Sequence, residues 1–199
     1  MDRYEKEHWK GSVMTAPLPP ALVSCGFEGK ENVLTVAWTG ILNTHPPMTY
    51  ISVRPERYSY GLIKDSGEFV VNLPTQQMVR AVDWCGVRSG ARYDKFRECG
   101  LHTEKCENVA APMISECPVS IECKVRSITE LGTHHMFIAD IVGLDVAKEL
   151  LDSSGRLCLE KAGLLAFAHG EYFALGRKLG TFGYSVRKKP KKKKASGSK

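Results

Sequence analysis

Short apolar runs separated by turn-forming residues dominate the first half of the chain. Residues 21–27 and 33–38 are two such runs, and the Gly- and Asn-containing stretch 28–32 between them predicts a hairpin loop. Residues 43–47, which include two prolines, are expected to break the chain again. Residues 48–54 then alternate between apolar and polar positions until a proline ends the run. This pattern predicts three antiparallel strands.

Three further strands are predicted downstream. Residues 68–73, Glu-Phe-Val-Val-Asn-Leu, are almost wholly apolar, which is typical of a strand buried on both faces. Residues 119–129 and 136–144 form two more strand patterns, joined by a Gly-Thr-His-His connection. About six antiparallel strands with a few short helices indicate a mainly β, barrel-like fold with helical decorations.

Helical signals are few and short. Residues 58–66 fit a helix that Gly67 terminates. A second helix is expected after Thr75, which can cap it, and before Gly86. Residues 88–118 look loop-rich, and a helical piece is expected near 145–151.

Charge is distributed unevenly along the 199 residues. The formal net charge is +6, but eight positive residues lie in 187–199, so residues 1–186 carry a net charge of −2. We therefore expect one folded domain that ends at residue 186, followed by a disordered Lys-rich tail (187–199). Such a tail either solubilises the chain or binds polyanions such as nucleic acid weakly.

The sequence favours a cytoplasmic protein without a membrane segment. No apolar run approaches the roughly 18–20 residues that a membrane-spanning helix needs, and the charged N-terminus lacks a secretory apolar region. Seven scattered cysteines make a fully paired disulfide framework improbable, so we expect reduced thiols. Cys25, inside a predicted strand, is interpreted as a small buried apolar residue.

Two kinds of site are disfavoured by spacing. Cys99, His102, Cys106 and Cys117 are thiols and an imidazole of the type that binds zinc or iron–sulfur clusters, but no C-x-x-C pair occurs. We predict no metal site, while leaving that set to be tested by structure. The glycines of residues 176–183 have the wrong spacing for a dinucleotide-binding turn, and no P-loop is present.

An anion site is indicated at the junction between a predicted strand and a predicted helix. Arg54 and Arg57 lie there beside serine and tyrosine hydroxyls, and a helix N-terminus favours a bound phosphate. Trp38, at the end of a neighbouring strand, offers a flat apolar wall for a planar ring. The alternative is a solvated strand end and a core tryptophan.

Several motifs together resemble the flavin reductase-like family, with the flavoredoxin group as its nearest relatives. They are Pro20–Ser24, Asn32-Val33, Ala37–Thr39, Pro46-Pro47, Ser52–Pro55, Arg57–Ser59, Ser66–Pro74, Ser89-Gly90, Asp94–Phe96, Gly132–His134, Gly170–Tyr172 and Leu175-Gly176, spanning roughly residues 13–186. The resemblance implies a six-stranded antiparallel Greek-key split β-barrel that binds FMN and forms a homodimer. It also implies an N-terminal extension (1–12) ahead of the domain (13–186).

The resemblance also implies roles for individual residues. Lys95 would approach the flavin ring and stabilise negative charge on it, or else be an ordinary surface lysine. His134 would face the site as a hydrogen-bonding or proton-donating group, with His135 on the opposite face, or else be a turn histidine. Phe167 and Tyr172 would cover the ring, or else be core aromatics. The ring and ribityl chain would contact Asn32, Thr35, Ala37, Trp38 and Thr39, and the ribityl and phosphate end would contact Ser52, Val53, Arg54, Arg57, Tyr58 and Ser59.

These observations predict an FMN-dependent oxidoreductase. It would take electrons from NAD(P)H or a protein donor and pass them through FMN to a flavin, metal or protein acceptor, with Lys95 and His134 as its candidate catalytic residues. One alternative is a flavoredoxin-like electron carrier that does not use NAD(P)H directly. An alternative of a different class is a polyanion-binding module that acts through the Lys-rich tail.

Overall fold

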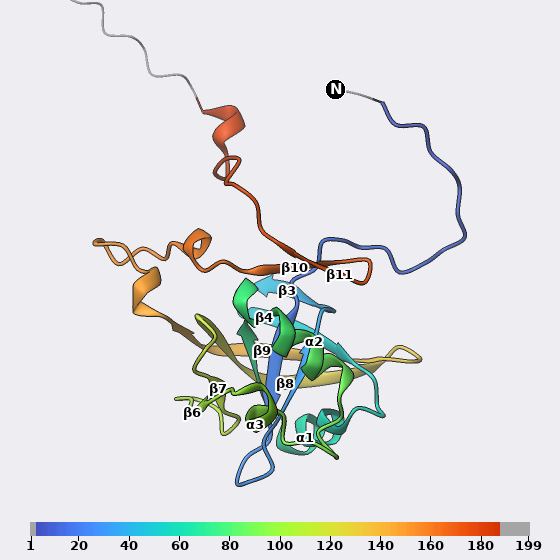
Figure 1. The fold of residues 1–199 in the computed structure, drawn as a ribbon, viewed down its shortest axis with the longest axis vertical. Coiled ribbons are helices and arrows are strands. Elements are labelled where there is room, and N and C mark those ends of the chain that lie inside the picture. Colours follow the sequence, from blue (N-terminus) through green and yellow to red (C-terminus); the bar gives the residue numbers. More distant parts are fainter. Residues whose placement is uncertain (1–2, 188–199) are drawn as a thin grey trace, which may run out of the picture.

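The structure, a computed structural model, describes residues 3–187 and is built on one antiparallel sheet (Figure 1). Seven strands pair in the order β2-β1-β5-β8-β9-β4-β3. This is one strand more than the six expected. The strands are β1 (Ala21–Cys25), β2 (Asn32–Val36), β3 (Thr39–Thr44), β4 (Pro47–Val53), β5 (Glu68–Leu73), β8 (Val119–Glu130) and β9 (His135–Val146).

The connection between β2 and β3 shows that the sheet curls. These two strands stand at opposite ends of the strand order, yet only Ala37 and Trp38 separate them in the chain. The two edges of the sheet must therefore lie close together. The backbone N–H of Ser52 in β4 donates to the carbonyl oxygen of Trp38 at 2.9 Å, so the connection is itself bonded to β4.

The alternation of side chains in β1 and β5 separates two apolar cores. Val23 and Phe69 point into the barrel with Ile51 and Phe137, and all four are fully buried. Leu22 packs on the other face, under the helices. Strand β5 is buried on both faces, as its sequence predicts, because the segment that contains Val109 and Ala111 covers its outer side.

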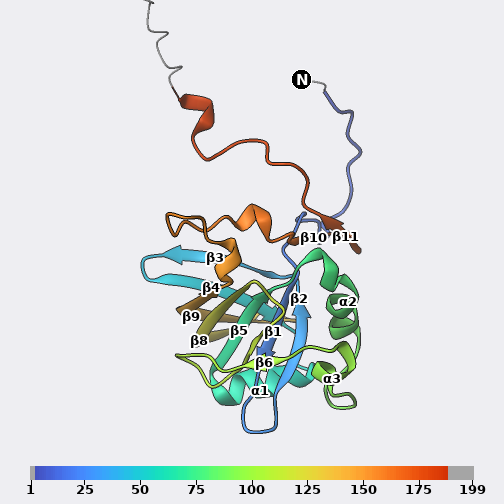
Figure 2. The same ribbon diagram turned by 60° about the vertical axis from the view of Figure 1, so that its left-hand side comes forward.

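Three short helices flank the sheet. Helix α1 (Tyr58–Ser66) occupies the predicted range and ends at Gly67, whose φ of 69° lies in the left-handed region. Helices α2 (Val79–Val87) and α3 (Lys95–Cys99) stack beside β2 (Figure 2). Two small hairpins, β6 (Thr103–Glu104) with β7 (Met113–Ile114) and β10 (Leu165–Ala168) with β11 (Glu171–Ala174), complete the structure, together with 3₁₀ turns at Gln76–Met78, Lys148–Leu150, Leu159–Lys161 and Tyr184–Val186.

Several local predictions were wrong. The expected break at 43–47 is shorter, since β3 runs to Thr44 and β4 starts at Pro47, where a first-residue proline is tolerated. Strand β3 was missed because it is largely exposed and carries a register shift after Ile41, which removes the alternating pattern. The side chain of Thr75 makes no capping hydrogen bond, and a 3₁₀ turn precedes α2. Strand β9 extends through Val146, so the helical piece is only one turn.

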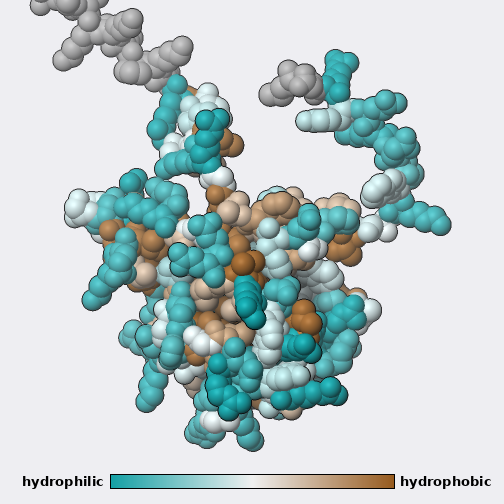
Figure 3. Space-filling view, viewed as in Figure 1, coloured by the Kyte–Doolittle hydropathy of each residue, from teal (hydrophilic) through white to brown (hydrophobic). Residues whose placement is uncertain are grey.

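The two ends of the described chain leave the body on the same side. Residues 3–17 and 175–187 extend beyond the β10–β11 hairpin (Figures 1 and 2). Apolar side chains gather on the upper part of the body, below these two segments, whereas the segments themselves are mostly hydrophilic (Figure 3). Within residues 3–187, no helix has the length and apolar character required to cross a membrane.

Candidate functional site

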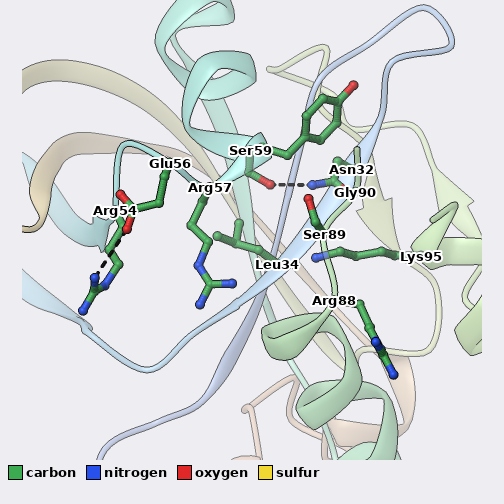
Figure 4. A pocket seen from close by; sticks show the side chains of 11 residues that line it. Asn32, Leu34, Arg54, Glu56, Arg57, Ser59, Arg88, Ser89, Gly90 and Lys95 are labelled. Carbon is green, nitrogen blue, oxygen red and sulfur yellow. Dashed lines mark hydrogen bonds and ion pairs between the residues drawn. The ribbon is translucent and has the colours of Figure 1, made fainter. Parts of the chain in front are cut away.

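A cationic cavity of about 400 Å³ lies between the N-terminus of α1, the start of β2 and the loop that follows α2 (Figure 4). Arg57 and Lys95 extend into the same space from opposite sides, while the side chain of Arg88 is directed away from it. The first turn of α1 contains no acidic residue, so its backbone N–H groups add to the positive potential. This is the environment that a bound anion requires.

A buried polar pair forms the wall of this cavity. The side-chain amide of Asn32 donates to the hydroxyl of Ser59 at 2.6 Å, and both residues are almost completely buried. Gly90 packs directly against this amide, because a Cβ at position 90 would lie only 2.5 Å from the Asn32 Cγ. Glycine is therefore the residue that lets the loop approach β2 this closely.

Lys95 is a buried cation. Only 4% of this residue is exposed, and its ammonium group donates to the carbonyl oxygen of Cys85 at 2.7 Å. Burial lowers the pKa of Lys95, and Arg57 acts in the same direction. Lys95 is thus not an ordinary surface lysine.

The cations of the cavity are incompletely neutralised by the protein. Arg54 contacts Glu56 at 3.3 Å, with both side chains well exposed. Arg57 donates to the carbonyl oxygen of Gly86 at 3.1 Å. Within the described part of the chain, neither Arg57 nor Lys95 forms an ion pair with a carboxylate.

A second, smaller hollow of about 150 Å³ continues from the cationic cavity and shares Leu34, Arg54 and Arg57 with it. Trp38 and His134 form its far wall, with ring centroids 4.2 Å apart and ring planes at 46°. Burial lowers the pKa of His134, and Arg54 adds to this effect. The lowered pKa favours the neutral imidazole, which can both donate and accept a hydrogen bond.

The two histidines of the β8–β9 connection face opposite sides, as alternation predicts. His134 borders the hollow, and its Nδ1 lies 3.0 Å from the hydroxyl of Thr133. His135 is engaged elsewhere, because its Nδ1 and the Tyr60 hydroxyl are hydrogen-bonded at 2.8 Å. His134 alone of the two can contact a ligand in the hollow.

A third cavity of about 330 Å³ extends past Thr35 and Ala37, which also line the second hollow. Phe167 and Tyr172 form its outer side, with ring centroids 5.2 Å apart. The Tyr172 hydroxyl donates to Asp83 at 3.4 Å. The second hollow thus shares lining residues with both of the other cavities, and we call the three together the β2 groove, cationic at one end and aromatic at the other.

The β2 groove brings together every candidate site residue except Thr39. The hydroxyl of Thr39 donates to the Tyr50 carbonyl oxygen at 2.6 Å, within the β3–β4 pairing, and Thr39 does not line the groove. The residues that do line it are Asn32, Thr35, Ala37, Trp38, Ser52, Val53, Arg54, Arg57, Tyr58, Ser59, Lys95, His134, Phe167 and Tyr172.

Sequence reasoning did not assign the loop after α2 to the site. Arg88, Ser89 and Gly90 line the cationic cavity, and Leu34 and Glu56 lie on its other side. The pair Ser89-Gly90, which follows the predicted helix, could have indicated that this loop belongs to the site, because glycine lets a loop approach another strand closely.

The cysteine–histidine set does not converge. His102 pairs with Glu116 through Nδ1 at 2.6 Å, and Cys106 packs in a different apolar cluster from Cys99 and Cys117. Within residues 3–187, no three His, Cys, Asp or Glu side chains are grouped so that they could hold a metal ion.

Cys25 is fully buried in β1, as predicted. Of the predicted Lys-rich tail (187–199), the structure describes only Arg187, and residues 188–199 lie outside the described residues.

Comparison with known proteins identifies the class. The family model described as flavin reductase like domain matches residues 13–176, and the chain belongs to this family. Its fold is accordingly that of the flavin reductase-like split barrels, as expected.

Particular relatives are similar to the chain at different levels. A flavoredoxin of Desulfovibrio vulgaris (Miyazaki F) is 30% identical with a TM-score of 0.85, covering 92% of this chain and all of that one. An FMN-binding protein from Thermus thermophilus, solved with bound 1-cyclohex-2-enone, is 23% identical with a TM-score of 0.75, covering 91% and 99%, and supports the fold alone. A ferric-chelate reductase (NAD(P)H) of Archaeoglobus fulgidus is 26% identical over 110 residues, which are 54% of this chain and 63% of that protein.

Proposed function

We propose that the protein is an FMN-dependent oxidoreductase whose cofactor lies in the β2 groove. The observation that carries this proposal is the pairing of two features in one groove. Arg57 and the buried Lys95 have no carboxylate partner in the described chain, and the mutually tilted rings of Trp38 and His134 form an aromatic wall beside them. An anionic group attached to a planar ring fits both features. Membership of the flavin reductase-like family supports FMN as that ligand.

The cationic end fits the phosphate of FMN. Arg57 and the N-terminus of α1 supply charge and N–H donors, and the Ser59 hydroxyl lies in the same wall. A buried ammonium is destabilised by its loss of hydration, so an anionic ligand near Lys95 would offset that loss. The residues present are therefore chemically suited to a phosphorylated ligand.

The middle of the groove fits a flavin ring. When bound, FMN supplies hydride acceptance and the onward transfer of electrons. Trp38 and His134 would hold the ring in place. Lys95 lines the adjoining cationic cavity and not this hollow, so its ammonium would favour negative charge on the part of the ring that reaches that cavity. Phe167 and Tyr172 would limit access of water from the far end.

Cofactor binding is tested by titrating the purified full-length protein with FMN and recording flavin absorbance and fluorescence. Arg57→Ala removes a hydrogen-bonding cation from the proposed phosphate end, so its dissociation constant should rise roughly 10- to 100-fold. Arg126→Ala is the matched control, since Arg126 pairs with Asp140 on the exposed surface of β8. Equal FMN affinity of the wild type and Arg57→Ala would contradict the proposed orientation. No FMN binding by the wild type would refute the function.

The electron donor is tested by anaerobic titration of the FMN-loaded protein. Rapid bleaching of the flavin band by stoichiometric NADH or NADPH supports a reductase, and the similarity to a ferric-chelate reductase (NAD(P)H) favours this outcome. Reduction by dithionite alone supports an electron carrier, and the similarity to a flavoredoxin favours that second candidate. A flavin, a metal or a protein remains the proposed acceptor in either case.

The protein is also proposed to act as a homodimer. Large apolar side chains are strongly exposed in the single chain, among them Ile41 at 82% and Leu144 at 57%. A partner subunit that packed on these side chains would remove them from water. Sedimentation analysis of the wild type should give twice the monomer mass, and a monomer at micromolar concentration would contradict this proposal.

A further inference from the structure

Two cysteines contact each other beside the β2 groove. The sulfur of Cys85 in α2 lies 3.8 Å from the sulfur of Cys99 at the end of α3, and both thiols are free. Within residues 3–187 this is the only hydrogen bond between two thiols. A disulfide needs a sulfur–sulfur distance of about 2.05 Å, so a modest movement of the two side chains would join them.

The local structure of α3 explains why the two sulfurs meet. Lys95 and Cys99 are four residues apart, so they lie on the same face of the helix. This face is directed at Cys85, because Lys95 donates to its carbonyl oxygen at 2.7 Å while Cys99 contacts its sulfur. Asp94 caps the start of α3, and Gly100 ends it in the left-handed region. The pair is thus held by the packing of two helices.

The two thiols differ in accessibility. Cys85 is only 1% exposed, whereas Cys99 is half-buried and lines a cavity of about 440 Å³. Met78, Trp84 and Leu101 form apolar parts of the cavity wall, whereas Gln77, Arg80, Glu98 and Glu116 make other parts polar or charged. None of the lining residues belongs to the β2 groove. A small molecule that enters the cavity therefore meets Cys99 and not Cys85.

We propose that Cys85 and Cys99 form a redox-active dithiol that reduces a small, uncharged organic disulfide bound in this cavity. The Cys99 thiolate attacks one sulfur of the ligand, and the other half of the ligand leaves as a thiolate that takes up a proton. Cys85 then loses its proton and attacks the Cys99 sulfur in the mixed disulfide, which releases the second thiol. One organic disulfide is reduced to two thiols, and the two cysteines are oxidised to one disulfide.

The charged groups around the pair determine how the reaction depends on pH. Burial raises the pKa of Cys85 to about 12 and also raises the pKa of Cys99. The hydrogen bond with Cys85 and the charges of Lys95 and Arg80 lower the pKa of Cys99 in part, whereas Glu98 adds to the rise. Glu116 also lines the cavity. Because the thiolate is the nucleophile, the rate should rise about tenfold per pH unit below the pKa of Cys99.

The test treats the native full-length protein with hydroxyethyl disulfide, followed by acid quenching and peptide mapping. The wild type should release two mercaptoethanol molecules per chain from this site and yield a cross-link between α2 and α3. In Cys85→Ser the mercaptoethanol adduct should persist on Cys99. Cys106→Ser, which alters a half-buried thiol in another cluster, should behave as the wild type does.

Three outcomes would overturn the proposal. The first is a stable adduct on Cys99 in the wild type without a cross-link, and the second is no reaction at Cys99 while the urea-unfolded chain reacts. The third is a reaction of Cys85 in Cys99→Ser that is as fast as the reaction of the pair in the wild type, because Cys99 would then not be the first nucleophile. Cys99→Ser changes a half-buried position, so this test remains available if Cys85→Ser folds poorly.

Discussion

Replacing Gly90 with alanine should damage the cationic end of the β2 groove by displacing a buried amide. The added Cβ would lie 2.5 Å from Cγ and 2.8 Å from Nδ2 of Asn32, distances that real Cβ atoms do not tolerate. Asn32 is 3% exposed and cannot turn toward solvent without leaving its partner. The 2.6 Å hydrogen bond from its amide to Ser59 must therefore lengthen or break.

The expected loss of stability follows from leaving the Asn32 amide and the Ser59 hydroxyl without their mutual hydrogen bond. Breaking a buried hydrogen bond between neutral side chains costs about 1–3 kcal/mol when both groups stay buried. For a chain of this length, a loss of roughly 2 kcal/mol lowers Tm by about 4–8 °C. Since Ser59 belongs to the proposed phosphate end, FMN affinity should fall in the same variant.

The assay is urea and thermal unfolding of Gly90→Ala beside the wild type, followed by FMN titration. Gly61→Ala is the control, because a Cβ at this position in the middle of α1 would meet nothing within 4 Å. That control should be stabilised by up to about 1 kcal/mol, since alanine is the better helix former. A Gly90→Ala variant as stable as the wild type would refute the reasoning, because the side-chain amide of Asn32 would then have moved without lowering the free energy of unfolding.

Three further predictions concern other parts of the molecule. The free energy of unfolding of Gly143→Ala, measured with urea, should be about 1–3 kcal/mol lower than that of the wild type, because the added Cβ would lie 2.6 Å from Oε1 of the buried Glu122. Equal stability of the variant and the wild type would contradict this prediction. Burial raises the pKa of Cys25 from 9.0 to about 12, so above about pH 9 the native chain keeps a proton that the unfolded chain loses. The free energy of unfolding should therefore fall as the pH rises above about 9. A free energy of unfolding that stays constant up to about pH 10 would contradict this prediction. Oxidation of Cys85 and Cys99 closes a loop of roughly 15 residues and should raise the stability by at most about 3 kcal/mol in thermal unfolding, an effect that Cys99→Ser should abolish.

Local sequence patterns determined most of the elements. The helix over residues 58–66 was predicted at its observed bounds because Gly67 provides a left-handed terminator that few other residues accept. The doubly buried strand 68–73 was recognised from its unbroken apolar run. Strand β3 was missed because it is largely exposed and its register shift breaks the alternating pattern, and helix α3 was missed because five residues carry too little periodicity to be detected.

The candidate site was only partly visible in the sequence. Arg54 and Arg57 belong to one continuous strand–helix junction, so their proximity followed from local spacing. Their assignment to FMN came from the family resemblance, and the individual contacts stay predictions. The boundary of the domain at residue 186 also stays a prediction, although the family model covers residues 13–176.

The sequence by itself determined which side chains were available, namely the cations, the indole and the Ser-Gly loop, and where most strands begin and end. Only the tertiary structure decided that these groups share one groove. Strands β2 and β4 approach each other because the sheet curls through Ala37 and Trp38, and Lys95 reaches the site because α3 packs on α2. Such contacts join residues far apart in the chain, and they depend on the order of strands in the sheet. No local pattern of apolar and polar residues specifies that order.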